Sequence, residues 1–129
     1  MVLVASSVWI DFLSHKRSRE NEKLEKLIRE KNQVVISGII LQEILQGIYN
    51  RRSYELTYRL LIRFPFIPPD IFTYLQAAEL FQKLTAKGYK PSTIDTLIAA
   101  LAIQNDVTLF TLDHGFAFIQ ANSDLQLFK

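Results

Sequence analysis

The sequence predicts an α/β protein in three layers (α/β/α), with helices on both faces of a mainly parallel sheet of four to five strands. Short runs of apolar, β-branched residues recur along the chain, and helical patterns separate them. These runs are almost continuously apolar, as expected for parallel strands covered on both faces. In such sheets ligands bind at the carboxyl ends of the strands, so functional side chains are expected there.

Length and composition predict one domain over residues 1–129. The chain is 49% hydrophobic and 22% charged, which is ordinary for a globular protein. The apolar start lacks the basic residues of a secretory signal, and no apolar run approaches the roughly 20 residues that span a bilayer. The chain has no cysteine, which excludes disulfides and thiolate zinc sites. We therefore expect a cytoplasmic protein without a membrane partner.

The strands and helices follow from local patterns. Strands are predicted at residues 2–4, 33–36 and 107–111, with an edge strand at 125–128. The hydroxyls of Ser6 and Ser7 are expected to cap a helix over 8–13. Further helices are predicted over 19–31, over 37–50 with Ser37 as its cap, over 51–64, from Asp70 as its cap to about 88, and over 92–103.

Three acidic residues occupy positions where either a structural or a functional role is open. Glu43 lies at the border of an apolar helix face, where a glutamate can also simply reach water. Asp95 follows Ser92 in a pattern that resembles a capping box, yet it heads a helix that is apolar almost all round. Asp113 follows the strand at 107–111, either as a turn aspartate or as a ligand at a strand end.

The equivalent position after the first strand is occupied by Ala5, which is chemically silent. The chain has only two histidines. Any metal site would therefore be built mainly from carboxylates, which suit Mg²⁺ or Mn²⁺ better than Zn²⁺.

Four segments together resemble the PIN domain, and most closely the VapC-type toxin ribonucleases of toxin–antitoxin pairs. They are Val-Leu-Val-x-Ser-Ser-Val-Trp-Ile-Asp-Phe-Leu at the start, Ser-x-Ile-x-Leu-Gln-Glu-Ile ending at Ile44, Ile-Asp-x-Leu-Ile-Ala-Ala around Asp95, and Leu-Phe-Thr-Leu-Asp-x-x-Phe around Asp113. Each segment is weak alone, but their common order and spacing are specific. The resemblance covers the whole chain.

The resemblance implies an RNA-cleaving site in which four acids hold one or two Mg²⁺ or Mn²⁺ ions. Glu43, Asp95 and Asp113 match three of these acids, and Ala5 stands where the family has an aspartate. Ser7 and Thr111 match supporting hydroxyls near the first and last acids. Asp11 lies within the following helix and is not taken as the missing ligand.

The resemblance also implies the toxin of a type II toxin–antitoxin system, a homodimer that cleaves RNA and is silenced by a VapB-like antitoxin. Loss of the aspartate predicts that this copy is inactive or nearly so. Its origin is open between an engineered Asp-to-Ala change and a natural loss, and the retained acids and hydroxyls favour the first. The alternative function is a naturally inactive PIN-like module that only binds RNA or an antitoxin.

Two further features carry open interpretations. Arg51, Arg52, Arg59 and Arg63 share a helical stretch with Tyr49, Tyr54 and Tyr58, which indicates either an RNA-facing or partner-facing surface or a solvated helix. His114 is interpreted as a surface turn residue, with an RNA contact as the alternative.

Overall fold

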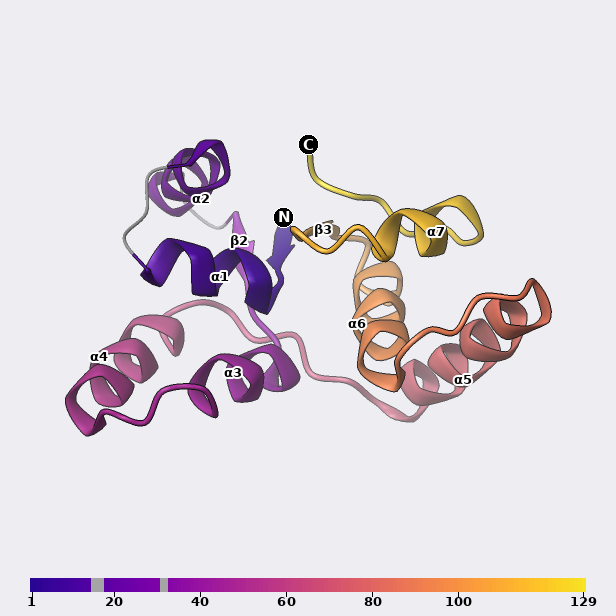
Figure 1. Ribbon diagram of the computed structural model, residues 1–129, viewed down its shortest axis with the longest axis horizontal. Helices are drawn as coiled ribbons and strands as arrows, with labels where there is room; N and C mark the ends of the chain where they lie inside the picture. The colour runs from indigo at the N-terminus through magenta and orange to yellow at the C-terminus, as the bar shows by residue number, and fades with distance from the viewer. Residues whose placement is uncertain (15–17, 31–32) are drawn as a thin grey trace.

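A parallel sheet forms the centre of the protein in a computed structural model of residues 1–129, which describes all residues except 15–17 and 31–32 (Figure 1). Its strands are β1 (Val2–Val4), β2 (Val34–Val35) and β3 (Thr108–Phe110), in the order β2-β1-β3. The register pairs Val2 with Val34 on one side of β1, and Val4 with Phe110 on the other. The carboxyl ends of β1 and β3 therefore lie next to each other.

One isolated parallel bridge extends each edge of this sheet. Ile36 pairs with Phe66 beyond β2, and Leu109 pairs with Leu127 beyond β3. The predicted edge strand at 125–128 thus contributes one bridge, and the four to five predicted strands become three strands with a bridge at each edge. Beyond β2 the prolines explain the short pairing: Pro65, Pro68 and Pro69 have no N–H to donate to a ladder.

Seven helices are described. In Figure 1, α1 (Ser6–Leu13), α2 (Arg19–Arg29) and α4 (Arg51–Leu61) lie to the left of the strands, and α3 (Gly38–Leu45) lies below them. To the right lie α5 (Ile71–Ala86), α6 (Thr93–Gln104) and α7 (Phe116–Ala121). This arrangement confirms the predicted α/β fold, with helices flanking a parallel sheet.

The helices differ from the predictions at two places, and one predicted helix end cannot be compared. The helix predicted over 37–50 ends at Leu45, and Asn50 instead caps α4 by accepting from the backbone N–H of Ser53. The short helix α7 was not predicted at all. The predicted end of α2 near Lys31 falls outside the described residues.

Helix α6 is buried between β3 and α5, as its apolar composition predicts. Its buried residues are Thr96, Ile98, Ala99, Ala100, Leu101 and Ala102. Alanines let neighbouring backbones approach closely, so α5 packs along α6. Trp9 is also fully buried, and its ring contacts Phe12 and Phe64 with centroid separations of 6.1 and 5.5 Å, as expected for a core residue.

Within the part of the chain that the structure describes, no helix is long and apolar enough to cross a membrane.

Candidate active site

Residue 5 lies where the ends of β1 and β3 meet. The Ala5 N–H donates to the carbonyl of Phe110 at 2.8 Å, which continues the pairing of the two strands by one residue. Ala5 is also the residue from which α1 begins, and its methyl group makes no cap. It is buried at 5% exposure. A side chain at position 5 thus starts from the edge of the sheet where Thr111 follows β3.

The two serines after Ala5 bond to Glu43 and to the segment after β3 rather than capping α1, which corrects the predicted role of their hydroxyls. Ser6 Oγ donates to Glu43 Oε1 at 3.2 Å. Ser7 Oγ accepts from the Leu112 N–H at 3.1 Å and lies 3.5 Å from Thr111 Oγ1. The first turn of α1 therefore contacts both α3, which carries Glu43, and the segment after β3.

Asp95 stands in the first turn of α6 and is half-buried. Its N–H donates to Ser92 Oγ at 3.0 Å, which confirms Ser92 as the helix cap. Burial raises the pKa of Asp95 above its ordinary value of 3.8, the carboxylates of Asp113 and Glu43 raise it further, and the hydrogen bond with Ser92 opposes the shift. Asp95 therefore lies within electrostatic reach of both other acids.

Asp113 is an exposed turn residue that also belongs to this cluster. Its N–H donates to Thr111 Oγ1 at 3.0 Å, and its Oδ1 accepts from the Gly115 N–H at 2.8 Å. Such an aspartate turn fixes the direction of the carboxylate. The structural and functional interpretations of Asp113 are thus compatible, because the turn fixes the carboxylate while its charge raises the pKa of Asp95.

The three acids offer the type of oxygen ligand that a divalent cation prefers, but too few of them lie close together to hold one. Carboxylate oxygens are the ligands that Mg²⁺ and Mn²⁺ prefer. Among the residues described, however, no three His, Cys, Asp or Glu side chains lie close enough together to hold a metal ion. Ala5 adds neither an oxygen nor a charge. The described residues therefore offer carboxylates of a suitable donor type but no group of three that could hold the ion.

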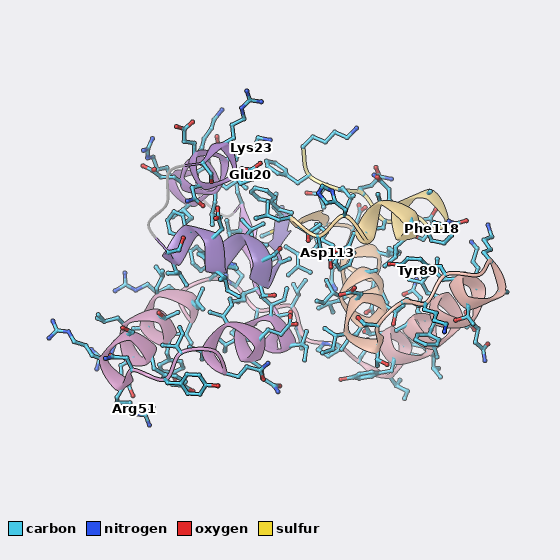
Figure 2. All side chains as sticks on the ribbon, in the orientation of Figure 1. Glu20, Lys23, Arg51, Tyr89, Asp113 and Phe118 are labelled. Atoms are coloured by element: carbon cyan, nitrogen blue, oxygen red, sulfur yellow. The ribbon has the colours of Figure 1, made fainter. Side chains whose placement is uncertain are left out.

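Other candidate residues lie outside this cluster. Asp11 accepts from Ser18 Oγ at 3.0 Å, and Ser18 caps α2, so Asp11 joins two helices. His114 is exposed, consistent with a surface turn residue. Figure 2 shows Arg51 at the edge of the view beyond α4, away from Asp113. Its guanidinium lies over the Tyr54 ring at 5.0 Å, so it contacts its own helix.

Three residues near the acids, Ser6, Tyr89 and Gly115, make contacts that the sequence did not predict. Ser6 was expected to cap a helix, and its bond to Glu43 requires α1 and α3 to lie side by side. Tyr89 and Gly115 contact each other and the Asp113 turn. No local signal marks Tyr89, whereas a glycine two residues after an aspartate is typical of a turn.

Comparison with solved structures shows the same fold in three bacterial proteins. FitAcB from Neisseria gonorrhoeae has a TM-score of 0.80 and 24% identity, covering 100% of this chain and 97% of its own. VapBC2 from Rickettsia felis, bound to a DNA fragment from their promoter, has a TM-score of 0.81 and 22% identity, covering 99% and 98%. VapC20 from Mycobacterium tuberculosis, a Sarcin-Ricin loop cleaving toxin, has a TM-score of 0.65 and 18% identity, covering 94% and 95%.

The family comparison rests on sequence and covers almost the whole chain. The model of the PIN domain matches residues 2–121, a range that includes position 5 and all three acids. With the parallel sheet and the acids at its carboxyl edge, this match establishes that the chain belongs to the PIN-domain family.

Proposed function

We propose that this protein is the toxin of a type II toxin–antitoxin system, a Mg²⁺- or Mn²⁺-dependent endoribonuclease whose present form is inert because residue 5 is alanine. The observation that carries the proposal is where Glu43 and Asp113 lie: Ser6, next to residue 5, donates to Glu43 at 3.2 Å, and Asp113 follows β3, whose end bonds to Ala5. The raised pKa of Asp95 fits a position near both acids. PIN-domain proteins are typically nucleases, and PIN nucleases generally use divalent metals. The Sarcin-Ricin loop cleaving activity of the similar M. tuberculosis toxin supports RNA as the substrate.

An aspartate at position 5 would complete the ligand set, joining Glu43, Asp95 and Asp113. A divalent ion held there supplies an activated water and neutralises charge on the phosphate. The residues of this chain hold the acids in place: Ser6 donates to Glu43, and Thr111 accepts from the N–H of Asp113. With alanine at position 5, three acids repel one another without a fourth ligand to hold the cation.

The alternative function is a naturally inactive PIN-like module that only binds RNA or an antitoxin. One observation favours it: the described acids of this chain form no group that could hold a metal ion. The two functions differ in what Ala5→Asp would do. A protein that was once active should regain cleavage with this single change, because its other acids and hydroxyls remain in place.

The first prediction concerns residue 5. Ala5→Asp should produce Mg²⁺- or Mn²⁺-dependent RNA cleavage at least about a hundredfold above that of the present chain, the scale of losing a central electrostatic group. Adding Asp95→Asn should abolish it again, because the acids form one site. Cleavage of RNA oligonucleotides is measured with metal and with EDTA for all three proteins.

Asp11→Asn in the Ala5→Asp protein is the matched control, since Asp11 joins α1 to α2 and should leave cleavage intact. Equal activity before and after the Ala5→Asp change, or cleavage that persists in EDTA, would refute the proposed site.

We also propose an antitoxin partner, placed in a groove of about 540 Å³ between α1, α3 and α4. Its apolar walls include Ile10 of α1, Ile44 of α3 and Leu56 of α4. Ile10 and Leu56 are more than half exposed, an arrangement suited to an apolar segment of a small protein. Because Glu43 precedes Ile44 on α3, a bound segment could extend an arginine toward the acids, where carboxylates attract a guanidinium.

We further propose that two copies of this protein form a homodimer through α5. Ile71, Phe72, Tyr74 and Leu75 at the start of α5 are all at least half exposed. No charged side chain interrupts this stretch, so two copies could meet there without repulsion. RNA and antitoxin would then be bound by a protein with two copies of the acid site. The cytoplasm, where RNA is present, is the proposed location.

A further inference from the structure

Tyr89 follows a glycine turn at the end of α5. Gly88 has a positive φ of 85°, a conformation that favours glycine, and the next N–H, that of Tyr89, donates to the carbonyl of Leu84 at 3.1 Å. This turn directs Tyr89 against α7. Its ring stacks on that of Phe118 with a centroid separation of 4.7 Å and an interplanar angle of 23°, and Figure 2 shows the two residues between α5 and α7.

The Tyr89 hydroxyl contacts the turn that holds Asp113. It donates to the carbonyl of Gly115 at 3.3 Å, while the N–H of Gly115 donates to Asp113 Oδ1 at 2.8 Å. One glycine therefore bonds to Tyr89 through its carbonyl and to Asp113 through its amide. The ring stack on Phe118 fixes where the hydroxyl can lie, since a stacked ring retains little rotational freedom.

Gly115 lies close to two polar side chains. A Cβ built on it would lie 2.9 Å from the Tyr89 hydroxyl oxygen and 3.2 Å from Asp113 Oδ1. Its backbone angles, φ −58° and ψ −27°, are ones that any residue adopts. A larger residue at position 115 would therefore displace the Tyr89 hydroxyl or the Asp113 carboxylate, and backbone conformation would not oppose it.

We propose that Tyr89 is a positioning residue for Asp113, acting through Gly115. This inference rests on the proposed function, because it assigns Tyr89 a part in holding one acid of the nuclease site. Tyr89 lies on the α5–α6 connection, outside all four segments that resemble the family. The stacked ring and its hydroxyl hold the Gly115 peptide, and the Gly115 amide holds the carboxylate of Asp113 in one direction.

The first measurement is the exchange rate of the Gly115 amide by NMR, in the metal-free protein with Ala5. Tyr89→Phe keeps the ring stack and removes the hydroxyl, so exchange should become about two- to tenfold faster, the range that one neutral hydrogen bond supplies. Tyr49→Phe is the control for this measurement, because Tyr49 is 94% exposed. Unchanged exchange in Tyr89→Phe overturns the proposal.

The second measurement is Mn²⁺ affinity by calorimetry in the Ala5→Asp background. Tyr89→Phe should weaken binding by about two- to tenfold. Gly115→Ala should weaken it more, and its effect should shrink in the presence of Tyr89→Phe, because the 2.9 Å contact with the hydroxyl is then absent. Faster Gly115 exchange without a change in Mn²⁺ affinity, or independent effects of the two substitutions, would overturn the positioning role.

The two measurements separate this inference from the proposed function. If Ala5→Asp binds no Mn²⁺ and cleaves no RNA, the proposed nuclease is wrong and Tyr89 has no metal ligand to position, so the inference falls with it. If Ala5→Asp binds Mn²⁺ and cleaves RNA while Tyr89→Phe alters neither Gly115 exchange nor affinity, only the inference is wrong.

Discussion

Burial and the charges of neighbouring acids both disfavour the ionised carboxyl group of Asp95 in the folded protein. Burial and the carboxylates of Asp113 and Glu43 all raise its pKa above 3.8, so the folded protein binds this proton more tightly than the unfolded chain does. The contribution of Asp95 to the free energy of unfolding is therefore largest at low pH. It falls as the pH rises through the raised pKa and is constant above it.

Asp95→Asn should accordingly stabilise the metal-free protein at pH 7, by less than about 1 kcal/mol because solvent screens a half-exposed group. The gain should shrink as the pH falls through 3.8, because the Asp95 carboxyl then becomes protonated in the unfolded protein as well as in the folded protein. Urea unfolding in EDTA at pH 7 and pH 3.5 measures this difference. Asp124→Asn is the control for replacing an aspartate by an asparagine, because Asp124 is exposed and lies outside the acid site. A larger gain at acidic pH than at neutral pH would contradict the assignment.

At the scale of elements, α3 places Glu43 because its start is fixed at the end of β2. Ser37 is 1% exposed, and its hydroxyl accepts from the N–H of Ile40. The buried side of the helix, which includes Ile40 and Ile44, packs into the core. Cap and core together orient Glu43 toward Ser6, with which it shares a hydrogen bond.

Ser37→Ala should reduce the free energy of unfolding by about 1 kcal/mol, the usual cost of losing a serine cap. The change should move the urea midpoint and leave the m-value unchanged, since the surface exposed on unfolding stays the same. Ser53→Ala, in the first turn of α4, is the matched control because its hydroxyl does not cap a helix. Equal stability of Ser37→Ala and the parent would show that the cap does not stabilise α3.

For the whole molecule, the proposed partners use separate surfaces: the groove between α1, α3 and α4 for the antitoxin, and the start of α5 for a second copy. Figure 1 shows α4 and α5 on different sides of the strands. A substitution on one surface should therefore impair one interaction and leave the other intact. Leu56 lines the groove at 59% exposure, and Phe72 lies on α5 at 69% exposure.

Leu56→Glu should weaken binding of the proposed antitoxin by about tenfold or more and leave the dimer intact, because it places a charge in an apolar contact. Phe72→Glu should dissociate the dimer and leave antitoxin binding intact. Titration calorimetry with an antitoxin of the VapB type and sedimentation equilibrium measure the two effects. A parent protein that remains monomeric at high concentration refutes the dimer, and loss of both properties in either variant refutes separate surfaces.

The sequence alone determined the fold class and the start of each long helix. Ser37, Asp70 and Ser92 were predicted as caps, and each accepts a backbone N–H at the start of its helix. These predictions succeeded because a cap acts on its own next turn, so the signal is local. The strands that precede residue 5 and Asp113 were found by the same local apolar pattern.

Local patterns failed where neighbours distant along the chain decide the structure. Helix α7 has too few residues for a helical pattern to be distinct, and its burial of Phe116 and Ile119 in the core stabilises it. Residues 48 and 49 continue an apolar helical pattern, yet the chain leaves the helix after Leu45 so that α4 can pack beside α3.

The candidate acids were named from the sequence, but only the tertiary structure decided how they act on one another. The resemblance of four sequence segments to a family selected Glu43, Asp95 and Asp113. The helical connections between the parallel strands brought these acids within electrostatic reach of one another. The bond from Ser6 to Glu43 and the contact of Tyr89 with Gly115 join segments far apart in the chain. Such contacts leave no local signal, because they depend on where packing places two backbones and not on either segment alone.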